Sequence, residues 1–391
     1  MPLRFLTAGE SHGPGLTTIV EGLPAGVPVV KSAIDRELKR RMAGHGRGGR
    51  MKIESDEVEI LGGVRFARTL GSPVALLIRN RDYANWAAVM DPQGVRPSDD
   101  DARAITRPRP GHADLAGALK VGTHDARDIL ERASARETAA RTAAGALAKA
   151  LLSELGIVVT SRTVGVGAVI AADGEANDVE ALLALADDAP MRALDAATVR
   201  AMIAAVDEAR ARADSVGGCF EVIARGVPPG LGSHAHWDRR LDARLGAAIL
   251  SIQAVKGVSI GEGIEVAAGG GAAAHDAIVY DATRRRFGRP TNRAGGIEGG
   301  MTNGENVRVR GYLKPLATLP HGLPSADLVT KQAFAADVER TDTVPIVAAG
   351  VVGEAMVALV LADAALEKFG GDAIRETRAN LDAFLAGLGD F

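Results

Sequence analysis

Short runs rich in apolar residues near the start of the chain are typical of β-strands. The runs "LRFLTA" (3–8), "LTTIVEGLP" (16–24) and "PVALLIRN" (73–80) predict three strands, and "RMKIESDEVEILGGVRF" (50–66) alternates like a β-hairpin. Between them, "KSAIDRELKRRM" (31–42) has helical spacing, with Ser32 placed to cap it and Gly44 just past its end.

Helical periodicity dominates the rest of the chain, interrupted by strand-like runs. The longest helical pattern covers 125–156, peripheral helices are predicted within 174–213, and a strand pair is predicted over 305–318. Segments 206–228 and 236–261 each predict a helix followed by a strand. The apolar run 344–366 is interrupted by Glu354 and Asp363, so it predicts a core helix rather than a membrane span. This irregular alternation favours an α+β fold, and we expect one domain spanning 1–391.

Composition narrows the functional classes. The net charge of −3 over 391 residues gives no reason to expect a nucleic-acid or membrane partner. Of the 46 basic residues 37 are arginines, which suit phosphate and carboxylate recognition, although a GC-rich genome produces the same excess. The single cysteine, Cys219, excludes an intrachain disulfide and a cysteine metal site. Because the N-terminus lacks the long apolar run of a signal peptide, we expect a cytoplasmic protein. We expect no metal site.

The stretch "GESHG" (9–13) matches G-x-S-x-G, the nucleophile elbow of α/β-hydrolases. Such an elbow needs a long helix directly after the serine, whereas "PGLTTIVEGLP" follows here. We therefore interpret it as a glycine-rich loop that presents Ser11 and His12 to a ligand, and we keep a serine hydrolase as the alternative.

A basic loop follows the first predicted helix. Arg40, Arg41, Arg47 and Arg50 lie among glycines in "KRRMAGHGRGGRMKIE", a pattern that favours an anion site. The alternatives are a solvated basic face and an RNA-binding Arg/Gly segment. Aromatic residues make up only 3% of the chain, which argues against the stacking platform that RNA binding needs.

Further candidates lie in three other segments. In "RPRPGHADLAG", prolines stiffen the approach to His112, although a loop histidine bonded to the nearby carboxylate Asp114 explains the pattern as well. "ERASARET" places Arg132 and Arg136 on one helical face, and an ordinary surface helix is its alternative. Asp342 precedes the last apolar helix and is equally a candidate N-cap.

A glycine-rich segment, "TNRAGGIEGGMTNG" (291–304), offers backbone amides to a phosphate or a flat heterocycle. No G-x-G-x-x-G stands in a βαβ context, so a Rossmann dinucleotide site is not indicated.

Taken in order and at their spacing, these segments resemble the chorismate synthase family. The resemblance runs over nearly the whole chain, in "LTAGESHGPGL", "LKRRMAGHGRGGRMKIESDEVEILGGV", "RPGHADLAGALKVG", "RASARETAARTAAGALAK", "TNRAGGIEGGMTNGE" and "ERTDTVPIVAAGVVGEAMVALVLADA". It implies an α+β sandwich with core helices between two antiparallel β-sheets, assembled as a homotetramer.

The family's reaction is the anti 1,4-elimination of phosphate from 5-enolpyruvylshikimate 3-phosphate to give chorismate, the last step of the shikimate pathway to aromatic amino acids. It requires reduced FMN but involves no net redox change, so the enzyme is a flavin-dependent carbon–oxygen lyase. The flavin carries the difficult chemistry, while the protein supplies binding, acid–base groups and exclusion of water.

The resemblance also implies site residues. His12, His112 and Asp342 would be catalytic: His12 protonates the departing phosphate, His112 lies at flavin N1 and the C2 carbonyl, and Asp342 relays a proton near N5. Substrate binding is implied for Ser11, Arg47, Arg50, Arg109, Ser134, Arg136 and Arg340. Flavin binding is implied for Arg132, Ala133, Ser134, Gln253, Ala254, Gly299, Lys314, Pro315, Leu316, Ala317, Thr318 and Arg340.

Two points stay open in the sequence. Arg41 and Arg47 match positions that the family assigns to NADP, yet they would equally bind the substrate's anionic groups. NADPH is thus a candidate source of electrons, and a separate flavin reductase is the alternative. Ala133 replaces the family's commonest serine, which costs one hydrogen bond, about 1 kcal/mol, if that contact uses the hydroxyl.

Overall fold

The structure is a computed structural model of the chain, and it describes every residue except 1, 49–54, 97, 99–101, 284 and 340. In its N-terminal part, β1 (Arg4–Ala8), β2 (Gly15–Glu21), β6 (Val74–Arg79) and β3 (Val58–Gly62) form an antiparallel sheet in the order β1-β2-β6-β3. Alternate residues of β2 and β6, such as Leu16, Val20 and Leu76, are buried on one face. The three strands predicted from the runs 3–8, 16–24 and 73–80 are confirmed.

A second antiparallel sheet comes from the later part of the chain. It consists of β10 (Val255–Ile260), β15 (Val307–Leu313), β9 (Gly218–Arg225), β7 (Val158–Val166) and β8 (Val169–Ile170), in the order β10-β15-β9-β7-β8. Phe220, Val222 and Ala224 of β9 are fully buried on the face that meets the helices.

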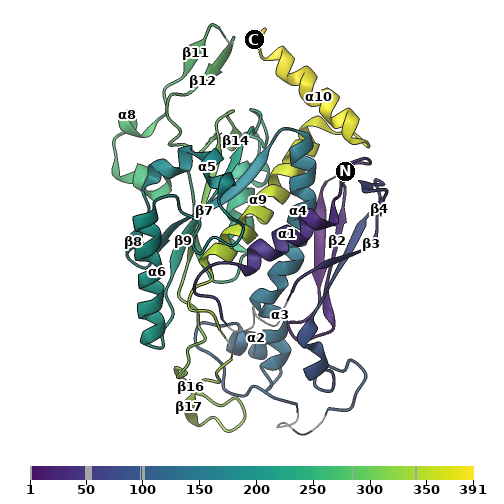
Figure 1. The fold of residues 1–391 in the computed structure, drawn as a ribbon, viewed down its shortest axis with the longest axis vertical. Coiled ribbons are helices and arrows are strands. Elements are labelled where there is room, and N and C mark those ends of the chain that lie inside the picture. The colour runs from purple at the N-terminus through teal and green to yellow at the C-terminus, as the bar shows by residue number, and fades with distance from the viewer. Residues whose placement is uncertain (1, 49–54, 97, 99–101, 284, 340) are drawn as a thin grey trace.

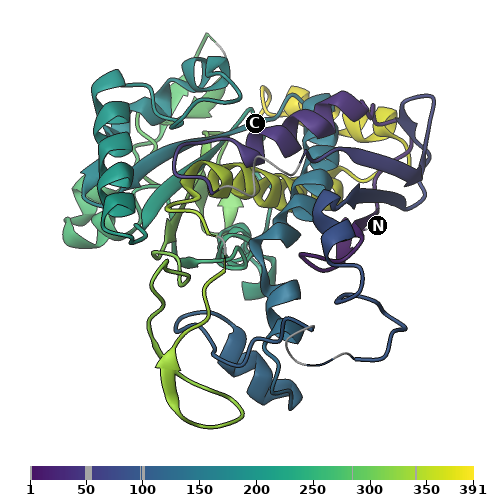
Figure 2. The ribbon, with the colours of Figure 1, turned by 60° about the horizontal axis from the view of Figure 1, so that its bottom comes forward.

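The two sheets are separated by α1 (Lys31–Met42), α4 (Thr138–Glu154) and α9 (Ile346–Phe369), as Figures 1 and 2 show. α4 packs on β2 and β6, α9 packs on β7 and β9, and the two helices pack on each other. The predicted α+β sandwich with core helices between two antiparallel sheets is confirmed. One cluster of buried apolar side chains extends from Leu3 to Leu381 through all of these layers.

Small residues allow α4 and α9 to approach closely. A Cβ built on Gly145 of α4 would lie 2.2 Å from the Cβ of Ala355 on α9, far inside van der Waals contact. α9 is long and apolar enough to cross a membrane, but 89% of its most apolar window is buried inside the protein. It is therefore the core helix that the sequence predicts.

Shorter elements surround this sandwich, and two hairpins and one short helix project from it. The hairpin of β11 (Val279–Asp281) and β12 (Arg286–Gly288) extends at one end of the molecule. At the other end, α2 (Asp114–Val121) lies beside the hairpin of β16 (Pro324–Ala326) and β17 (Ala333–Ala335), and Ser325 Oγ donates to the carbonyl of Pro108 there (Figures 1 and 2). The other α-helices and strands of the described chain are α3 (Arg127–Ala133), α5 (Val179–Ala184), α6 (Ala196–Ala211), α7 (Leu241–Leu250), α8 (Gly271–Ala274), α10 (Ile374–Gly387), β4 (Val64–Arg65), β5 (Arg68–Thr69), β13 (Ile297–Glu298) and β14 (Met301–Thr302).

Three local predictions are wrong. The strand-like run 50–66 does not form its own hairpin in the described part, because β3 pairs with β6 and β4 pairs with β5. Segment 305–318 contains one strand, β15, rather than a pair. The long helix predicted over 125–156 is divided at Ser134, which is extended and whose hydroxyl accepts the backbone N–H of Arg136. Serine competes in this way with the helical hydrogen bonds of the main chain.

Helix capping also differs from the prediction. Ser32 does not cap α1, whose N-cap is Val30 without a side-chain hydrogen bond. Asp342 does not cap α9, which begins after Pro345, so its carboxylate is available for other contacts.

Candidate functional site

The loop between β1 and β2 buries Ser11 and His12. Gly9 has φ +106°, and a Cβ at that position would lie 2.2 Å from the carbonyl oxygen of Gly15, so the tight return of the loop requires glycine. Asn80, at the end of β6, donates its side-chain amide to the carbonyls of Glu10 (3.0 Å) and Gly13 (2.8 Å). The loop leads into β2 rather than a helix, which excludes the nucleophile elbow of the α/β-hydrolases.

The helix break at Ser134 meets this loop. Ser134 Oγ lies 3.1 Å from Ser11 Oγ, so two predicted substrate residues 123 positions apart are in contact. Because the helix ends there, Arg132 and Arg136 do not share one helical face as the sequence predicts. Arg132 donates to the carbonyls of Thr7 (2.8 Å) and Gly9 (3.3 Å), whereas Arg136 Nε donates to Asn80 Oδ1 (2.9 Å).

A buried carboxylate joins two of the predicted arginines. Asp56 Oδ1 lies 2.6 Å from Arg136 Nη1, and Asp56 Oδ2 lies 3.0 Å from Arg41 Nη2. Burial opposes the charge of Asp56, but Arg41 and Arg136 outweigh it and lower the pKa of its carboxyl. Burial, together with the neighbouring Arg136 and Arg47, lowers the pKa of Arg41 to about 10 despite the attraction of Asp56. Arg41 is thus charged at neutral pH, and its Nε has no hydrogen-bond partner in the described chain.

A second carboxylate, Asp114, organises the loop that carries Arg109 and His112. Its Oδ2 accepts from Arg109 Nε at 2.8 Å, and its Oδ1 lies 2.5 Å from His112 Nδ1. Burial raises the pKa of Asp114, but hydrogen bonds from His112 and Arg109 reverse this and bring it well below its usual range. Arg109 Nη1 also donates to Thr318 Oγ1 at 3.0 Å, which links this loop to the predicted flavin segment.

Asp342 forms an ion pair with another predicted residue. Its Oδ2 accepts from Arg47 Nη1 at 2.7 Å, and its Oδ1 accepts the backbone N–H of Gly48 at 2.6 Å. Both side chains are mostly buried, with exposed fractions of 11% for Arg47 and 20% for Asp342. The predicted residues Arg50 and Arg340 lie outside the described residues.

Four of the predicted flavin residues, Arg132, Gln253, Ala254 and Lys314, take part in one chain of contacts. Arg132 lies 3.8 Å from Glu137, and Glu137 accepts a hydrogen bond from Gln253 Nε2 at 3.3 Å. Directly after Gln253, the carbonyl of Ala254 accepts the N–H of Lys314 at 3.0 Å, and Lys314 Nζ donates to the carbonyl of Gly111. These contacts connect the His12 loop to the loop of His112.

Elsewhere in the predicted flavin set, Ala133 ends α3, Pro315 follows Lys314, and the carbonyl of Leu316 accepts from Ser215. Ala317 lies near Gly111, where a Cβ would be 3.6 Å away.

Gly299 lies apart from the other candidates. The adjacent Gly300 accepts the N–H of Leu241 at the start of α7, whereas Gln253 follows the end of that helix. The ten residues of α7 separate the two positions by about 15 Å along its axis. A ligand that contacts both would have to span this length.

The site fits a flat, hydrogen-bonding cofactor in one specific respect. The side-chain oxygen of Gln253 is buried and has no hydrogen-bond partner in the described chain, which is costly unless a bound donor satisfies it. A flavin ring carries such an N–H donor at its pyrimidine edge. Among the described residues, no group of three or more histidine, cysteine or carboxylate side chains is arranged to hold a metal.

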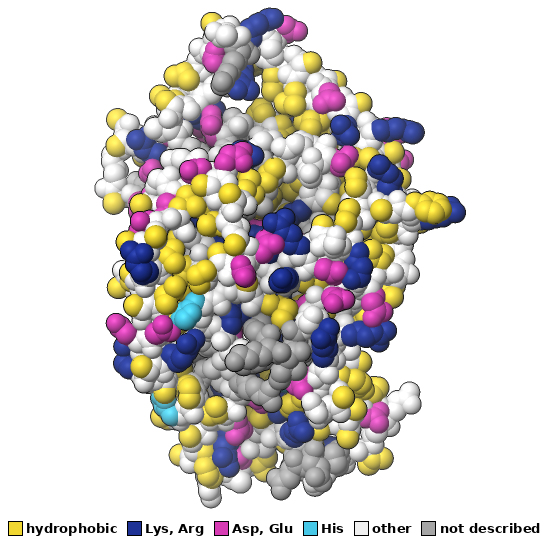
Figure 3. Space-filling view, viewed as in Figure 1, with side chains coloured by type: hydrophobic (Ala, Val, Ile, Leu, Met, Phe, Trp, Pro, Cys, Tyr) yellow, Lys and Arg dark blue, Asp and Glu magenta, His cyan; other side chains and the backbone are white. Residues whose placement is uncertain are grey.

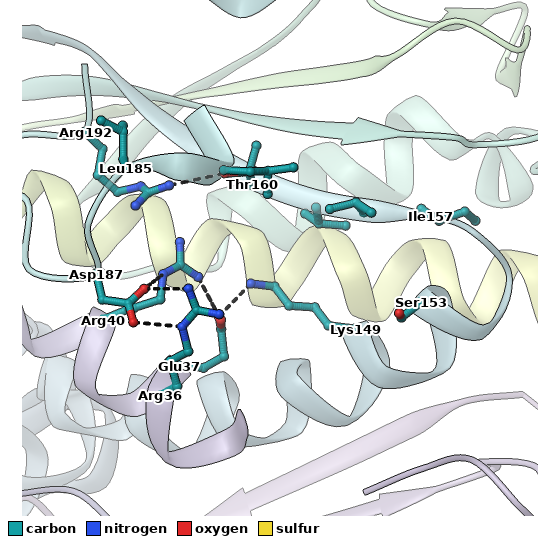
Figure 4. A pocket seen from close by; sticks show the side chains of 13 residues that line it. Arg36, Glu37, Arg40, Lys149, Ser153, Ile157, Thr160, Leu185, Asp187 and Arg192 are labelled. Atoms are coloured by element: carbon teal, nitrogen blue, oxygen red, sulfur yellow. Dashed lines mark hydrogen bonds and ion pairs between the residues drawn. The ribbon is translucent and has the colours of Figure 1, made fainter. Parts of the chain in front are cut away.

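Two cavities are relevant to the position of the site. The first, of about 390 Å³, borders the His12 loop and is lined by Glu10, Arg127 and Glu131 among others. The second, of about 210 Å³, lies between α1, α4 and β7 (Figure 4) and contains none of the predicted site residues. Its charges pair with one another: Arg40 and Lys149 both contact Glu37 and the fully buried Glu354. We interpret it as an ion network between the helices.

Among the described residues, acidic and basic side chains are mixed over the face of the molecule in Figure 3, whereas a surface that binds nucleic acid is expected to gather basic side chains.

Sequence reasoning gave no functional role to three carboxylates that contact the predicted arginines and histidines. Asp56, Asp114 and Glu131 are each buried, and each contacts at least one predicted site residue. Asp114 stands in the sequence only as a partner for an ordinary loop histidine, and that hydrogen bond is indeed formed. Asp56 comes from a distant segment, so spacing alone could not connect it with Arg136.

Comparison with known proteins identifies the family. A profile of the family described as chorismate synthase matches residues 3–366. The chain belongs to the chorismate synthase family. It is 55% identical to the chorismate synthase of Solibacter usitatus over 383 residues and 56% identical to that of Moorella thermoacetica over 382, covering 98% of each chain in both alignments. A solved structure titled "Crystal Structure of Chorismate Synthase" superposes with a TM-score of 0.80 at 40% identity, covering 100% of this chain and 99% of the other.

Membership of the chorismate synthase family agrees with the fold and with the order of the motifs. The predicted activity, a carbon–oxygen lyase that eliminates phosphate, is the activity of this family. Neither alternative class, a serine hydrolase nor an RNA-binding protein, accounts for a match over the whole chain.

Proposed function

We propose that this chain forms chorismate from 5-enolpyruvylshikimate 3-phosphate with reduced FMN, and that the contacts described above form one active site. The observation that carries the proposal is the continuous path of contacts from the His12 loop through Arg132, Gln253 and Lys314 to the loop of His112. These are the segments in which both the acid–base groups and the flavin contacts are expected.

Anion binding falls to the arginines. The substrate carries a phosphate and two carboxylates, and burying such charge is costly without positively charged partners. Arg109 and Arg136 are buried, and a carboxylate holds each in place. Arg47, Arg50 and Arg340 complete the proposed set, with Ser11 and Ser134 as neutral hydrogen-bonding groups. Guanidiniums suit this task because they bind oxyanions through two parallel hydrogen bonds.

Proton transfer falls to three side chains. We place His12 as the acid that protonates the departing phosphate, because it is a titratable group at the tip of the glycine-rich loop. Lys314, which belongs to the proposed flavin segment, donates to the carbonyl of Gly111 in the loop that carries His112. We assign to His112 the task of keeping the reduced flavin ring suitably protonated. Asp342 accepts and passes on a proton while Arg47 holds its carboxylate in place.

Reduced FMN would supply electron density to the substrate as phosphate leaves and take it back afterwards, so that no net oxidation occurs. Arg132, Gln253, Ala254 and the segment 314–318 would hold it, with the buried oxygen of Gln253 accepting a hydrogen bond from the ring. The backbone of Ala133, Ser134 and Gly299 and the side chain of Arg340 are the further proposed contacts. The protein's own tasks are to bind, to orient and to exclude water.

The tests of the residue roles use single variants under anaerobic conditions with reduced FMN. His12→Ala should lose most of its turnover while its affinity for FMN stays the same. Full turnover in this variant would contradict the proposal that His12 protonates the departing phosphate. Ser11 should not be labelled by a fluorophosphonate, whereas labelling would favour the hydrolase alternative.

The remaining properties are proposed from family membership alone. We propose a single-domain chain that assembles as a cytoplasmic homotetramer and binds neither nucleic acid nor membranes. Analytical ultracentrifugation tests the assembly. For the source of electrons, an aerobic assay with NADPH and FMN alone, compared with the same assay plus a separate flavin reductase, decides whether Arg41 and Arg47 serve an intrinsic NADPH reaction.

A further inference from the structure

Glu131, near the end of α3, contacts the Ser11–His12 loop at three points. Its Oε1 lies 2.8 Å from Nδ1 of His12, its Oε2 accepts the backbone N–H of His12 at 2.8 Å, and its own carbonyl accepts the N–H of Ser11 at 2.9 Å. The side chains are buried, with exposed fractions of 11% for His12 and 3% for Glu131. One residue thus fixes both the backbone and the ring of His12.

Glu131 is itself held from its other side. Arg127, one turn earlier on α3, donates Nη1 to Glu131 Oε1 at 3.1 Å, and its Nη2 donates to Glu339 at 3.2 Å. Burial raises the pKa of Glu131, but His12 and Arg127 outweigh this effect, so its carboxyl titrates below the usual range. Glu131 is therefore an ionised carboxylate at neutral pH and can only accept hydrogen bonds.

An acceptor at Nδ1 determines where the imidazole carries its proton. In neutral His12 the hydrogen must be on Nδ1, because the carboxylate offers no proton of its own. Nε2 is then the atom left to exchange a proton with a ligand, and it makes no hydrogen bond within the described chain. The indole of Trp86 stacks on the imidazole with centroids 4.0 Å apart and an interplanar angle of 26°, which limits rotation of the ring.

We propose that Glu131 is a positioning residue for the elimination, because its carboxylate keeps a hydrogen on Nδ1 of His12 in both protonation states of the ring. Nε2 of the protonated ring then carries the proton that passes to the departing phosphate, the neutral Nδ1–H tautomer remains afterwards, and Trp86 fixes the plane of the ring. The inference rests on the proposed role of His12 as the acid. Glu131 touches neither substrate nor flavin in this assignment, and it acts only through His12.

Glu131→Gln is the sharpest test because it keeps the size of the side chain. Its carboxylate accepts from Nδ1 and Arg127 at one oxygen and from the His12 backbone at the other. A glutamine has one oxygen, so in either orientation its NH₂ faces an N–H donor. With its oxygen on the backbone N–H, the NH₂ reaches the ring, and Nδ1 must become an acceptor.

The expected result is a change of tautomer together with a loss of rate. In solid-state NMR spectra of the ¹⁵N-histidine-labelled protein, the signal of His12 is identified by its loss in His12→Ala. This signal should show a hydrogen on Nδ1 in the unaltered protein and no hydrogen on Nδ1 in Glu131→Gln. We expect kcat to fall on the order of 100-fold, with the substrate KM and the FMN affinity changed by less than about threefold. Glu131→Asp, which keeps the charge, should retain the tautomer and recover at least about tenfold of the loss.

A matched control separates this effect from loss of stability. Glu37 lines the cavity of Figure 4, which contains none of the predicted site residues, and like Glu131 it accepts hydrogen bonds from an arginine and from a second nitrogen donor, here Lys149. Glu37→Gln should lower thermal stability but leave kcat unchanged. The double variant His12→Ala/Glu131→Gln should be no slower than His12→Ala alone, because both changes remove the same function.

The outcomes distinguish this inference from the proposed function. If His12→Ala keeps full turnover, the proposed role of His12 is wrong. If His12→Ala is inactive but Glu131→Gln keeps its kcat, or keeps the Nδ1–H tautomer while losing kcat, the role of His12 stands and the inference about Glu131 is overturned.

Discussion

Oδ1 of Asp114 lies 2.5 Å from Nδ1 of His112. Its other oxygen accepts from both the backbone N–H and the Nε of Arg109, at 3.1 and 2.8 Å. One fully buried carboxylate thus supports a residue proposed to act at the flavin and a residue proposed to bind substrate. The pairing of buried cations with a carboxylate recurs at Asp56 and at Glu131, and it keeps each cation in one geometry.

Asp114→Asn should affect both steps that this carboxylate supports. Without its charge, Arg109 and His112 lose their common partner, so we expect the substrate KM to rise and kcat to fall, each by about tenfold or more. His112→Ala should lower kcat with a much smaller change in KM. Steady-state kinetics at saturating reduced FMN measures both variants. An Asp114→Asn enzyme with unaltered kcat and KM would show that neither group depends on Asp114.

Asp342 and Arg47 should behave as a coupled pair. Asp342→Asn removes the proposed proton relay and the negative charge that lies 2.7 Å from Arg47, whose side chain is mostly buried. We expect kcat to fall on the order of 100-fold, and Arg47→Ala to raise the substrate KM. In a double-mutant cycle the effects should be non-additive because the two groups are in contact. Strict additivity in kcat would contradict a joint role.

The contact between the two core helices gives a stability prediction. Alanine normally stabilises a helix interior by up to about 1 kcal/mol relative to glycine. At Gly145, however, the new methyl group would overlap Ala355, so Gly145→Ala should destabilise the protein by roughly 1–3 kcal/mol. Gly246 on α7 is the matched control, because a Cβ there would meet nothing closer than 3.7 Å. Gly246→Ala should be neutral or stabilising in urea unfolding, and equal effects at both positions would contradict the packing.

Stability should fall in acid partly because of the buried carboxylates. The pKa of Asp114 is lower in the folded chain than its unfolded value of about 4, so its contribution is fully present above that pH. It is lost as the pH falls through about 4 towards the folded pKa, with a slope of at most about 1.4 kcal/mol per pH unit for one proton. The free energy of unfolding of Asp114→Asn, measured between pH 6 and 3, should therefore depend less steeply on pH than that of the unaltered protein. An identical slope would contradict the assignment.

The sequence predicts well those elements whose pattern is local. Short, mainly apolar runs located β1, β2 and β6, and helical spacing located α1 at its observed bounds. The α+β sandwich itself came from the family resemblance, since strand order depends on contacts between distant segments. The pairing of β3 with β6 is of this kind, and local alternation suggested a hairpin instead.

The candidate site shows the same division. His12, His112 and Asp342 were candidates through their motifs, and the family resemblance gave them their predicted roles. Asp342 forms an ion pair with Arg47 and does not cap α9. The contact of Ser11 with Ser134 and the carboxylate of Asp56 between Arg41 and Arg136 could not be predicted, because they arise only when remote segments pack together. The break of the long helix at Ser134 was missed because its sequence keeps good helical periodicity on both sides.

The central claim is an elimination that needs a reduced flavin yet consumes no electrons. The most direct measurement incubates the protein anaerobically with 5-enolpyruvylshikimate 3-phosphate and photoreduced FMN, and follows chorismate, phosphate and the flavin spectrum together. We predict equal amounts of chorismate and phosphate over many turnovers, a flavin that is still reduced at the end, and no product with oxidised FMN. Product formation with oxidised or absent FMN, or one flavin oxidised for each chorismate formed, would contradict it.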